Sequence, residues 1–365
     1  MFTSVRSFDR ERWLGFVRDT PDYPVLAHPD VLPWSLTDGD ALVYTDMVDG
    51  EIRTLGVMAR RCLPVVPEWP KLGTFAGWRL VGDRLAGDVD DEALGCFARA
   101  CRELLRAPGT DGILFEDLEV DGALWKAVEA VGTGGGVSLD RPKPAQPHWR
   151  IRFPEDPALY WQTLCGKVRR NLRRNIKHFP HTVEVVRSAE QVPDFLEAVS
   201  VISEQSWQGR RLGRRASADE RRRTAFESLA ELGALRCFLL RHDGEPVAFV
   251  YGWQWGGVFD YAQIGYDSRL AAKGPGKILL ARVLEDLIER DTPDVLDFGD
   301  GDADYKRRFG THHSLTGPLT LNSARLHTRV GLTLRHGRDS AHTGVRLALQ
   351  RAGVYDRIRR AYRRT

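Results

Sequence analysis

The sequence predicts a mixed α/β protein, with helices packed on a mixed sheet, built from two similar halves and a basic helical tail. At 365 residues the chain exceeds the size that one hydrophobic core usually supports. The order strand, turn, helix, strand occurs twice, at matching spacing. The 42% hydrophobic and 28% charged residues are typical of a globular protein. We therefore expect one domain over residues 1–150, a second over 151–324, and an extension over 325–365.

A hairpin opens the repeated pattern in each half. Residues 41–61 are predicted to form two strands around Asp49 and Gly50, and residues 235–255 repeat this around Asp243 and Gly244. Asp-Gly between two apolar runs indicates a tight hairpin turn, because that turn needs positive φ at both central positions.

A strand, a turn, an amphipathic helix and a short apolar strand then follow, over residues 77–118 and 259–301. The two turns differ in charge. The first contains Asp88, Asp90, Asp91 and Glu92, and the second contains Lys273, Gly274, Pro275, Gly276 and Lys277. The N–H groups at a helix N-terminus attract anions, whereas carboxylates there repel them. Only the second turn is expected to bind a phosphate. The alternative is that Gly-Pro-Gly merely begins a helix.

Composition argues against several classes of protein. The five cysteines include no C-x-x-C pair, and no His or Cys cluster has metal-ligand spacing, so we predict neither a disulfide framework nor a metal site. No run approaches the roughly 18 apolar residues of a membrane span, and the N-terminus lacks the apolar core of a signal peptide. We expect a cytoplasmic protein.

Charge is distributed unevenly along the chain. Residues 1–150 carry a net charge of −7 and residues 151–365 one of +10. The extension over 325–365 holds eleven arginines against two acids, and is predicted to dock on the acidic first half or to contact an anionic membrane surface. A second basic stripe lies on the helix predicted over 160–179. It is either a solvated face or a site for an anion or RNA.

Three motifs, in order, resemble the GNAT acetyltransferases. The basic helix "LCGKVRRNLRRNIKHF" (164–179), the turn "RLAAKGPG" (269–276) and the segment "DFGDGDADYKRRFG" (297–310) together resemble the CelD/BcsL-type branch of that superfamily. This branch is related to the Fem aminoacyltransferases, which carry two GNAT-like domains. The resemblance therefore implies tandem GNAT-like domains in a Fem-like architecture, with the first domain degenerate.

The same resemblance implies a site for an acyl-coenzyme A, such as acetyl-CoA, beside the second turn. Its diphosphate would meet the backbone amides of Gly274, Gly276, Lys277 and Ile278, with the side chains of Lys273 and Lys277 adding charge. The residues implied for this site are Gly265, Tyr266, Lys273, Gly274, Gly276, Lys277 and Ile278.

Three residues are candidates for the chemistry of acyl transfer. The resemblance implies Asp260 as a base, Tyr305 as the acid that protonates the leaving thiolate, and Lys306 as a stabiliser of the oxyanion. Each also has an ordinary alternative, as a solvated edge-strand acid, a core tyrosine and a surface lysine respectively. The acceptor side is assigned to Glu204, Trp207 and Asp302.

These expectations lead to one main hypothesis and two alternatives. The main hypothesis is an acyl-CoA-dependent N-acyltransferase that acts on a small-molecule, sugar or peptide amine by direct attack. The first alternative is a Fem-like transferase that uses aminoacyl-tRNA and therefore needs an extended basic surface. The second is a binding module without catalysis.

Overall fold

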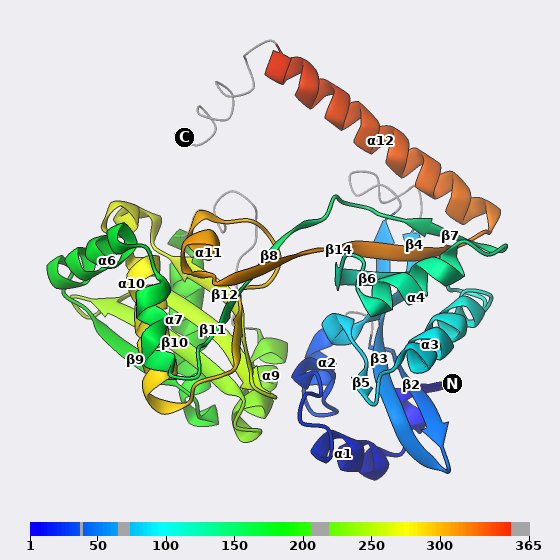
Figure 1. Cartoon of the computed structure of the whole chain (residues 1–365), viewed down its shortest axis with the longest axis horizontal. Coiled ribbons are helices and arrows are strands. Elements are labelled where there is room, and N and C mark those ends of the chain that lie inside the picture. The colour runs from blue at the N-terminus through cyan, green and yellow to red at the C-terminus, as the bar shows by residue number, and fades with distance from the viewer. Residues whose placement is uncertain (37–38, 65–73, 206–218, 352–365) are drawn as a thin grey trace.

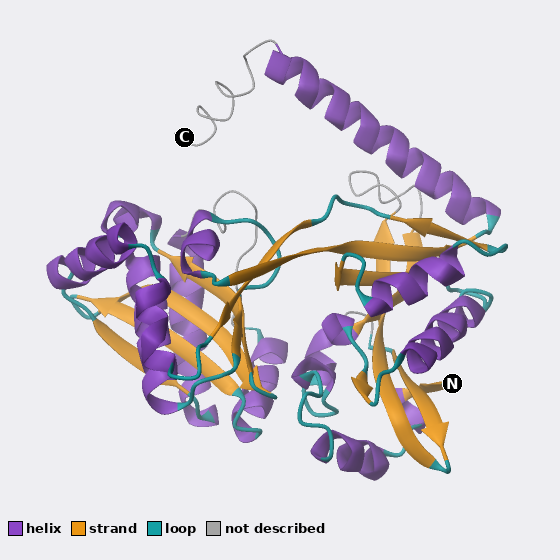
Figure 2. Cartoon of the chain, in the orientation of Figure 1, coloured by secondary structure: helices purple, strands orange, loops and turns teal. Residues whose placement is uncertain are grey.

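The computed structural model describes residues 1–36, 39–64, 74–205 and 219–351. In this part of the chain the strands form one 14-stranded sheet in the order β1-β2-β3-β4-β6-β14-β8-β13-β12-β11-β10-β9, with β5 paired to β3 and β7 to β14. Figure 1 shows the sheet passing through two lobes, and Figure 2 shows helices packed on both. The expected mixed α/β class is confirmed, because the sheet contains parallel and antiparallel pairs.

The first half, residues 1–150, forms one lobe. Its strands are β1 (Phe2–Ser4), β2 (Ala41–Val48), β3 (Glu51–Pro64), β4 (Thr74–Leu80), β5 (Ala86–Gly87), β6 (Gly112–Glu119), β7 (Val137–Asp140) and most of β8 (Gln146–Arg152). Its α-helices in the described residues are α1 (Arg10–Arg18), α2 (Leu32–Ser35), α3 (Asp91–Leu104) and α4 (Ala123–Gly132).

The second half, residues 151–324, forms the other lobe and ends with a strand that crosses back. Its strands are β9 (Thr182–Val186), β10 (Leu235–His242), β11 (Glu245–Trp255), β12 (Val258–Tyr266), β13 (Val295–Asp297) and β14 (His312–Ser323). Its α-helices in the described residues are α5 (Tyr160–Thr163), α6 (Gly166–His178), α7 (Val192–Gln205), α9 (Glu220–Glu231), α10 (Pro275–Arg290) and α11 (Asp304–Phe309), and α12 (Leu326–Arg351) follows.

Both predicted hairpins are present and use the same turn. Asp49 and Gly50 have φ of 51° and 86°, and Asp243 and Gly244 have φ of 52° and 83°. Positive φ at both central positions matches the twist of the flanking strands. Each hairpin is followed by a strand, a helix and a strand parallel to the first, namely β4, α3, β6 and β12, α10, β13.

The two crossover helices begin in different ways. The side chain of Asp90 accepts a hydrogen bond of 2.7 Å from the N–H of Ala93, so the acidic turn caps its own helix α3. Helix α10 begins after Gly274, which has φ of 72° and supplies no side-chain cap. The N-terminus of α3 is therefore already capped by a carboxylate, whereas the N-terminus of α10 is not.

The two halves share strands. Strand β14, at the end of the second half, pairs with β6 of the first from Thr316↔Glu119 to Asn322↔Gly112. Strand β8 pairs with β13 and with β14, so the boundary expected between residues 150 and 151 falls inside a strand. Figure 1 shows β8 and β14 running together between the lobes. Leu319 of β14 belongs to the same apolar core as Phe115 of the first half, and that packing fixes the pairing.

Helix α12 follows β14 and extends away from the sheet (Figure 1). It begins against the first half, where His327 Nε2 lies 2.6 Å from Asp111 Oδ1 and Leu332 is buried. Its apolar residues Leu326, Val330 and Leu334 are exposed. The expected C-terminal extension is thus helical to Arg351, and residues 352–365 lie outside the described part. Among the described helices, none has the length and apolar character needed to cross a membrane.

Candidate active site

The strands of the second half separate where the candidate site lies. β12 and β13 are paired only from Val258↔Val295 to Asp260↔Asp297, after which β12 continues to Tyr266 paired with β11 and no longer with β13. Beyond Asp297 the chain turns away through Gly299 and Gly301, both with positive φ. The last shared position of the two parallel strands therefore carries two carboxylates, Asp260 and Asp297.

A β-bulge positions Asp260. The register of β11 against β12 shifts between Tyr251 and Trp253, and a Cβ at Gly252 would lie only 2.1 Å from the carbonyl oxygen of Asp260. Glycine is therefore required for this close approach. The side chain of Trp253 hydrogen-bonds the Asp260 carboxyl group. Burial, together with the charge of Asp297, raises the pKa of Asp260 to about 6.

His148 joins the two halves beside this pair. Its Nδ1 lies 2.7 Å from Asp117 Oδ2 of β6, and its Nε2 lies 2.5 Å from Asp297 Oδ1 of β13. Ionised carboxylates only accept hydrogen bonds, so both ring nitrogens donate and the ring is an imidazolium. Arg150 Nε donates to the other oxygen of Asp297 at 2.8 Å.

The pKa values agree with that charge assignment. Burial by itself lowers the pKa of His148, but its hydrogen bonds to Asp117 and Asp297 outweigh burial and raise the pKa to about 9. Burial by itself raises the pKa of Asp297, but its hydrogen bond to His148 and the charge of Arg150 outweigh burial and lower the pKa to about 2. The pKa of Asp117 is lowered in the same way. The network holds fixed charges near Asp260.

Lys306 is buried beside the network and is not a surface lysine. It is 8% exposed, and its Nζ donates to the carbonyl oxygens of Gly299 at 3.1 Å and Asp300 at 2.5 Å. Burial lowers the pKa of Lys306, and the nearby carboxylates of Asp300 and Asp297 partly oppose that effect. An ammonium group has three N–H donors, so a third one is available for an oxyanion.

Tyr305, from the same short helix, is partly buried against the apolar core of the second half. Its ring packs edge-on against Phe298 at 5.8 Å, and burial raises the pKa of Tyr305 to about 12. The neighbouring Tyr261 is 3% exposed, and among the described residues its hydroxyl has no hydrogen-bond partner. An unpaired buried hydroxyl is costly, and this one lies within the apolar core of the second half.

The glycine turn offers fewer backbone amides than the sequence suggested. The N–H of Gly274 donates to Ala271 O at 3.1 Å, and those of Lys277 and Ile278 both donate to Gly274 O at 3.1 Å. These three amides are therefore occupied within the chain. Of the four predicted donors, Gly276 alone has no backbone acceptor among the described residues.

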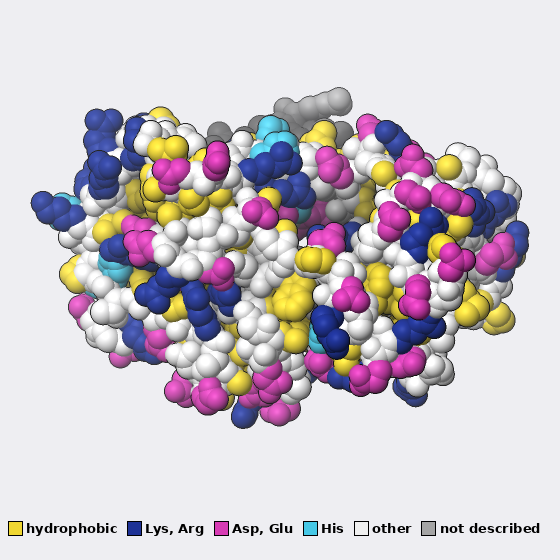
Figure 3. Space-filling model, turned by 60° about the horizontal axis from the view of Figure 1, so that its bottom comes forward, with side chains coloured by type: hydrophobic (Ala, Val, Ile, Leu, Met, Phe, Trp, Pro, Cys, Tyr) yellow, Lys and Arg dark blue, Asp and Glu magenta, His cyan; other side chains and the backbone are white. Residues whose placement is uncertain are grey.

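The surroundings of the turn are basic. Lys273 and Lys277 are exposed, and Lys273 Nζ lies 5.6 Å from the ring centre of Phe179. Helix α6 borders the turn, since Asn175 Nδ2 lies 3.3 Å from the place of a Cβ on Gly274. The exposed basic residues of α6 are Lys167, Arg170, Arg173, Arg174 and Lys177. Figure 3 shows Lys and Arg gathered at this end of the molecule.

The remaining predicted residues in the described part of the chain lie on β12, on α7 and in the segment before α11. Gly265 and Tyr266 end β12, and the ring of Tyr266 lies 3.2 Å from the place of a Cβ on Gly276, next to the turn. Glu204 is exposed near the end of α7. Asp302 accepts a bond from Trp149 Nε1 at 3.2 Å and pairs with Arg307, so structural contacts hold it. Trp207 lies outside the described residues.

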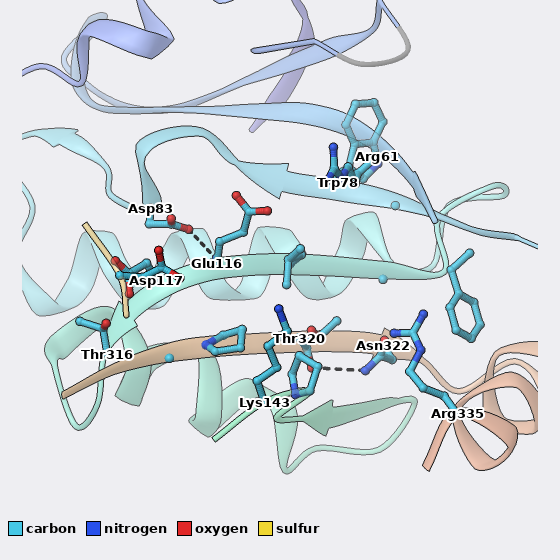
Figure 4. Close-up of a pocket in the computed structure, with 18 of the residues that line it drawn as sticks. Arg61, Trp78, Asp83, Glu116, Asp117, Lys143, Thr316, Thr320, Asn322 and Arg335 are labelled. Carbon is cyan, nitrogen blue, oxygen red and sulfur yellow. Dashed lines mark hydrogen bonds between the residues drawn. The ribbon is translucent and has the colours of Figure 1, made fainter. Parts of the chain in front are cut away.

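A groove on the first half leads to the same network. Its cavity volume is about 800 Å³, and its walls come from β3, β4, β6, β14, the segment before β8, and α12. Figure 4 shows Asp83, Glu116 and Asp117 at one end and Arg335 at the other. Asp117 belongs both to the groove and to the bonds of His148, so the groove reaches this network. Within the described residues, no group of His, Cys, Asp and Glu is arranged to hold a metal.

Comparison with known proteins supports this reading of the second half. Residues 166–307 match the family model described as acetyltransferase (GNAT) domain. We call this matched range the GNAT domain. The matched range runs from the start of α6 to α11, so this GNAT domain includes Asp260, the glycine turn, Tyr305 and Lys306.

Solved structures of similar fold cover nearly the whole chain. The structure of FemX has a TM-score of 0.62 at 13% identity and covers 91% of this chain and 100% of its own. The C-terminal domain of a lysylphosphatidylglycerol synthetase from Agrobacterium fabrum has a TM-score of 0.56 at 15% identity, covering 89% and 94%. L-PGS from Bacillus licheniformis has a TM-score of 0.53 at 14% identity, covering 90% and 97%. These likenesses show the fold. The sequence has no significant match among curated proteins.

Sequence reasoning did not find His148, Asp117 or Tyr261. His148 and Asp297 are 149 residues apart, and nothing local marks their pairing. Asp297 was part of the quoted Asp-Phe-Gly motif, but its role as a partner of His148 depends on β8 lying beside β13. The alternation of polar residues in "PHWRIR", with His148, Arg150 and Arg152 on one face, is the one local signal of a polar strand face.

Proposed function

We propose that the chain is a GNAT-type N-acyltransferase that transfers an acyl group from a coenzyme A thioester to an amine. One observation carries this proposal: the GNAT domain holds Asp260, with a pKa near neutral, at the point where β12 and β13 separate. A carboxyl group of that pKa is suited to accept a proton near pH 7.

Each candidate residue has one part in the proposed reaction. The nitrogen of the amine bonds to the thioester carbonyl carbon, and its proton passes to Asp260. Lys306 stabilises the negative charge that forms on the carbonyl oxygen. When the carbon–sulfur bond breaks, the thiolate takes a proton from Tyr305, whose raised pKa keeps that hydroxyl protonated at neutral pH.

The donor is proposed to bind with its phosphates at the turn before α10. The N–H of Gly276 and the exposed side chains of Lys273 and Lys277 supply one backbone donor and two charges there. The arginines of α6 extend the positive surface and offer further contacts to a phosphate.

Aminoacyl-tRNA is the second candidate donor. Two observations favour it: three of the four predicted amides are already bonded within the chain, and five exposed basic residues on α6 form a surface larger than one diphosphate requires. The overall fold is also that of FemX. The membership of the CelD/BcsL branch and a cytoplasmic location remain predictions from the sequence.

A thermal-shift panel separates the two donors. Purified protein is heated with millimolar acetyl-CoA, with free coenzyme A, and with an aminoacyl-tRNA, because a ligand that binds only the folded state raises its melting temperature. We expect stabilisation by acetyl-CoA that changes little between 50 and 200 mM salt. Stabilisation by the tRNA alone, lost over that salt range as phosphate contacts weaken, would replace the coenzyme A proposal.

A further inference from the structure

The groove on the first half is polarised along its length. Its described acidic lining residues include Asp83, Glu116 and Asp117, which Figure 4 shows together at one end. Asp117 at this end pairs with His148. Its basic lining residues are Arg61, Lys143, Arg335 and Arg338. Figure 4 shows Arg335 and Asn322 at the opposite end, with Lys143 reaching in from the side.

Strand pairing fixes where the basic end lies. Arg61, Gly77, Gly112 and Asn322 are register partners across β3, β4, β6 and β14, so they form one row over the sheet. Asp117 lies five residues further along β6. At about 3.3 Å per residue, the row and Asp117 are on the order of 17 Å apart.

The floor between the two ends is largely uncharged. Gly112, Leu114 and Thr320 line it, and Thr320 and Leu114 are register partners on neighbouring strands. A Cβ at Gly112 would lie 3.1 Å from the Asn322 side-chain oxygen, so a side chain there would narrow the groove. This floor has room for an extended chain.

The acidic end suits a positive group. Glu116 pairs with Arg79 at 2.9 Å and Asp117 pairs with His148. Within the described part of the chain, the one hydrogen-bond partner of the Asp83 carboxyl group is the N–H of Glu116, at 2.7 Å. Burial raises the pKa of Asp83 to about 7. An ammonium group next to Asp83 would hold this carboxyl in its ionised form.

Helix α12 supplies half of the basic end, although it follows the GNAT domain in the sequence. Arg335 is held in place by Phe75, with its guanidinium carbon 5.1 Å from the ring centre. Arg338 is one turn further along the helix and lines the same cavity. Guanidinium groups suit carboxylate and phosphate oxygens.

We propose that this groove binds the acceptor, and that the acceptor carries a carboxylate or a phosphate on the order of 17 Å from its reactive amine. The amine lies at the Asp83 and Asp117 end, next to the chemistry, and the anion lies between Lys143 and the arginines of α12. This inference rests on the proposed acylation of an amine at Asp260. It assigns the C-terminal extension a role in acceptor specificity.

Binding of five-residue peptides to the full chain tests the proposal by calorimetry, without any donor. An extended peptide of five residues spans roughly 17 Å, which matches the groove. The carboxylate arm compares pentaglycine with pentaglycinamide. The phosphate arm compares tetraglycyl-phosphoserinamide with tetraglycyl-serinamide. N-acetylpentaglycine tests the need for the amine.

In either the carboxylate or the phosphate comparison, we expect the anionic peptide to bind at least ten-fold more tightly than the matching peptide without that anion. Acetylation of the amine should weaken binding. Replacement of both Arg335 and Arg338 by Ala, or Lys143→Gln alone, should remove most of that ratio. Arg329→Ala, an exposed change on α12 outside the groove lining, should leave it unchanged. Lys143 lies outside α12, so the result for Lys143→Gln does not depend on how that helix folds.

Three results would overturn the proposal: no binding of any probe, equal binding of charged and neutral peptides in both arms, or a ratio that the variants leave unchanged. Failure of the donor proposal is recognised separately, because acetyl-CoA stabilisation is measured without an acceptor. Loss of that stabilisation with retained peptide selectivity would leave the groove assignment intact.

Discussion

At the scale of single residues, the candidate chemistry depends on a few buried charges that fix one another. His148 is held between Asp117 and Asp297, Lys306 is held by two carbonyl oxygens, and Asp260 is the one carboxyl group in this set whose pKa approaches neutrality. The fixed charges are therefore suited to binding and orientation, and Asp260 to proton transfer.

The role of Asp260 gives the first prediction. Its carboxyl group is protonated below about pH 6 and accepts a proton only above it, so kcat/KM should rise with pH through about 6 and then level. Asp260→Asn should lower kcat by on the order of a hundred-fold and remove this limb. The pH profile of acyl transfer measures both. A variant that keeps the limb would show that another group is the base.

The charge of His148 gives a prediction about stability. A group whose pKa is raised from 6.5 to about 9 on folding stabilises fully below pH 6.5, and that stability is lost as pH rises through about 9. His148→Gln removes the cation that pairs with Asp117 and one of the two cations that pair with Asp297, and should lower the free energy of unfolding by roughly 3 kcal/mol at pH 7. Urea denaturation from pH 6 to pH 9.5 measures this.

The control for that experiment is Arg150→Gln, which removes one bond to Asp297 but leaves the imidazolium. Its stability should still fall between pH 6.5 and pH 9. If His148→Gln keeps the same fall as the unmodified chain, the imidazolium assignment is wrong.

At the scale of elements, the two crossover helices show how one scaffold carries different helix ends. Asp90 occupies the N-terminus of α3, so that end has no place for an external anion. Helix α10 has no such cap and begins with a buried Pro275 and Gly276 between exposed lysines. A phosphate site is therefore expected at one of the two ends alone.

The cap of α3 gives a prediction with a matched control. Asp90→Ala removes a hydrogen bond to the Ala93 N–H and should lower stability by about 1 kcal/mol, with donor binding unchanged. Asp91→Ala removes an acid from the same turn that makes no recorded cap bond, so it should cost less. Equal costs, measured by thermal unfolding, would show that the cap bond does not stabilise the helix.

Patterns of neighbouring residues predicted the hairpins, but they did not predict which distant strands pair in the sheet. Each Asp-Gly turn specifies its own hairpin through two positive φ values, so the hairpins could be predicted from neighbouring residues. The pairing of β14 with β6 joins residues about two hundred positions apart, and no short pattern encodes it. The His148 network depends on that pairing and was missed for the same reason.

The occupied amides of the turn also escaped prediction. Residues Ser268–Lys273 form a 3-10 helix begun by Asp267, which brings Ala271 O to the N–H of Gly274. A run of glycines in a sequence indicates freedom of the backbone, but it does not say which N–H groups the chain itself uses. Only the geometry of the turn separates Gly276 from its neighbours.

At the scale of the whole molecule, the exchange of strands makes one sheet out of two lobes. The first half supplies Asp117 and most of β8, with His148, to a site whose other residues belong to the GNAT domain, and β14 completes the sheet of the first half in return. The first half is thus part of the candidate active site as well as a scaffold. Its groove and helix α12 extend that site toward the acceptor.

The most direct test of the central claim is the stabilisation of the chain by acetyl-CoA, compared between Gly276→Asp and Gly276→Ala. Both variants place a Cβ 3.2 Å from the ring of Tyr266, but only aspartate adds a negative charge at the turn. At a concentration of acetyl-CoA a hundred-fold above its Kd, we predict that the free energy of unfolding of the unmodified chain rises by about 2.7 kcal/mol. The rise should be smaller for Gly276→Ala and absent for Gly276→Asp. The account would be contradicted if acetyl-CoA did not stabilise the unmodified chain, or if it stabilised Gly276→Asp as much as the unmodified chain.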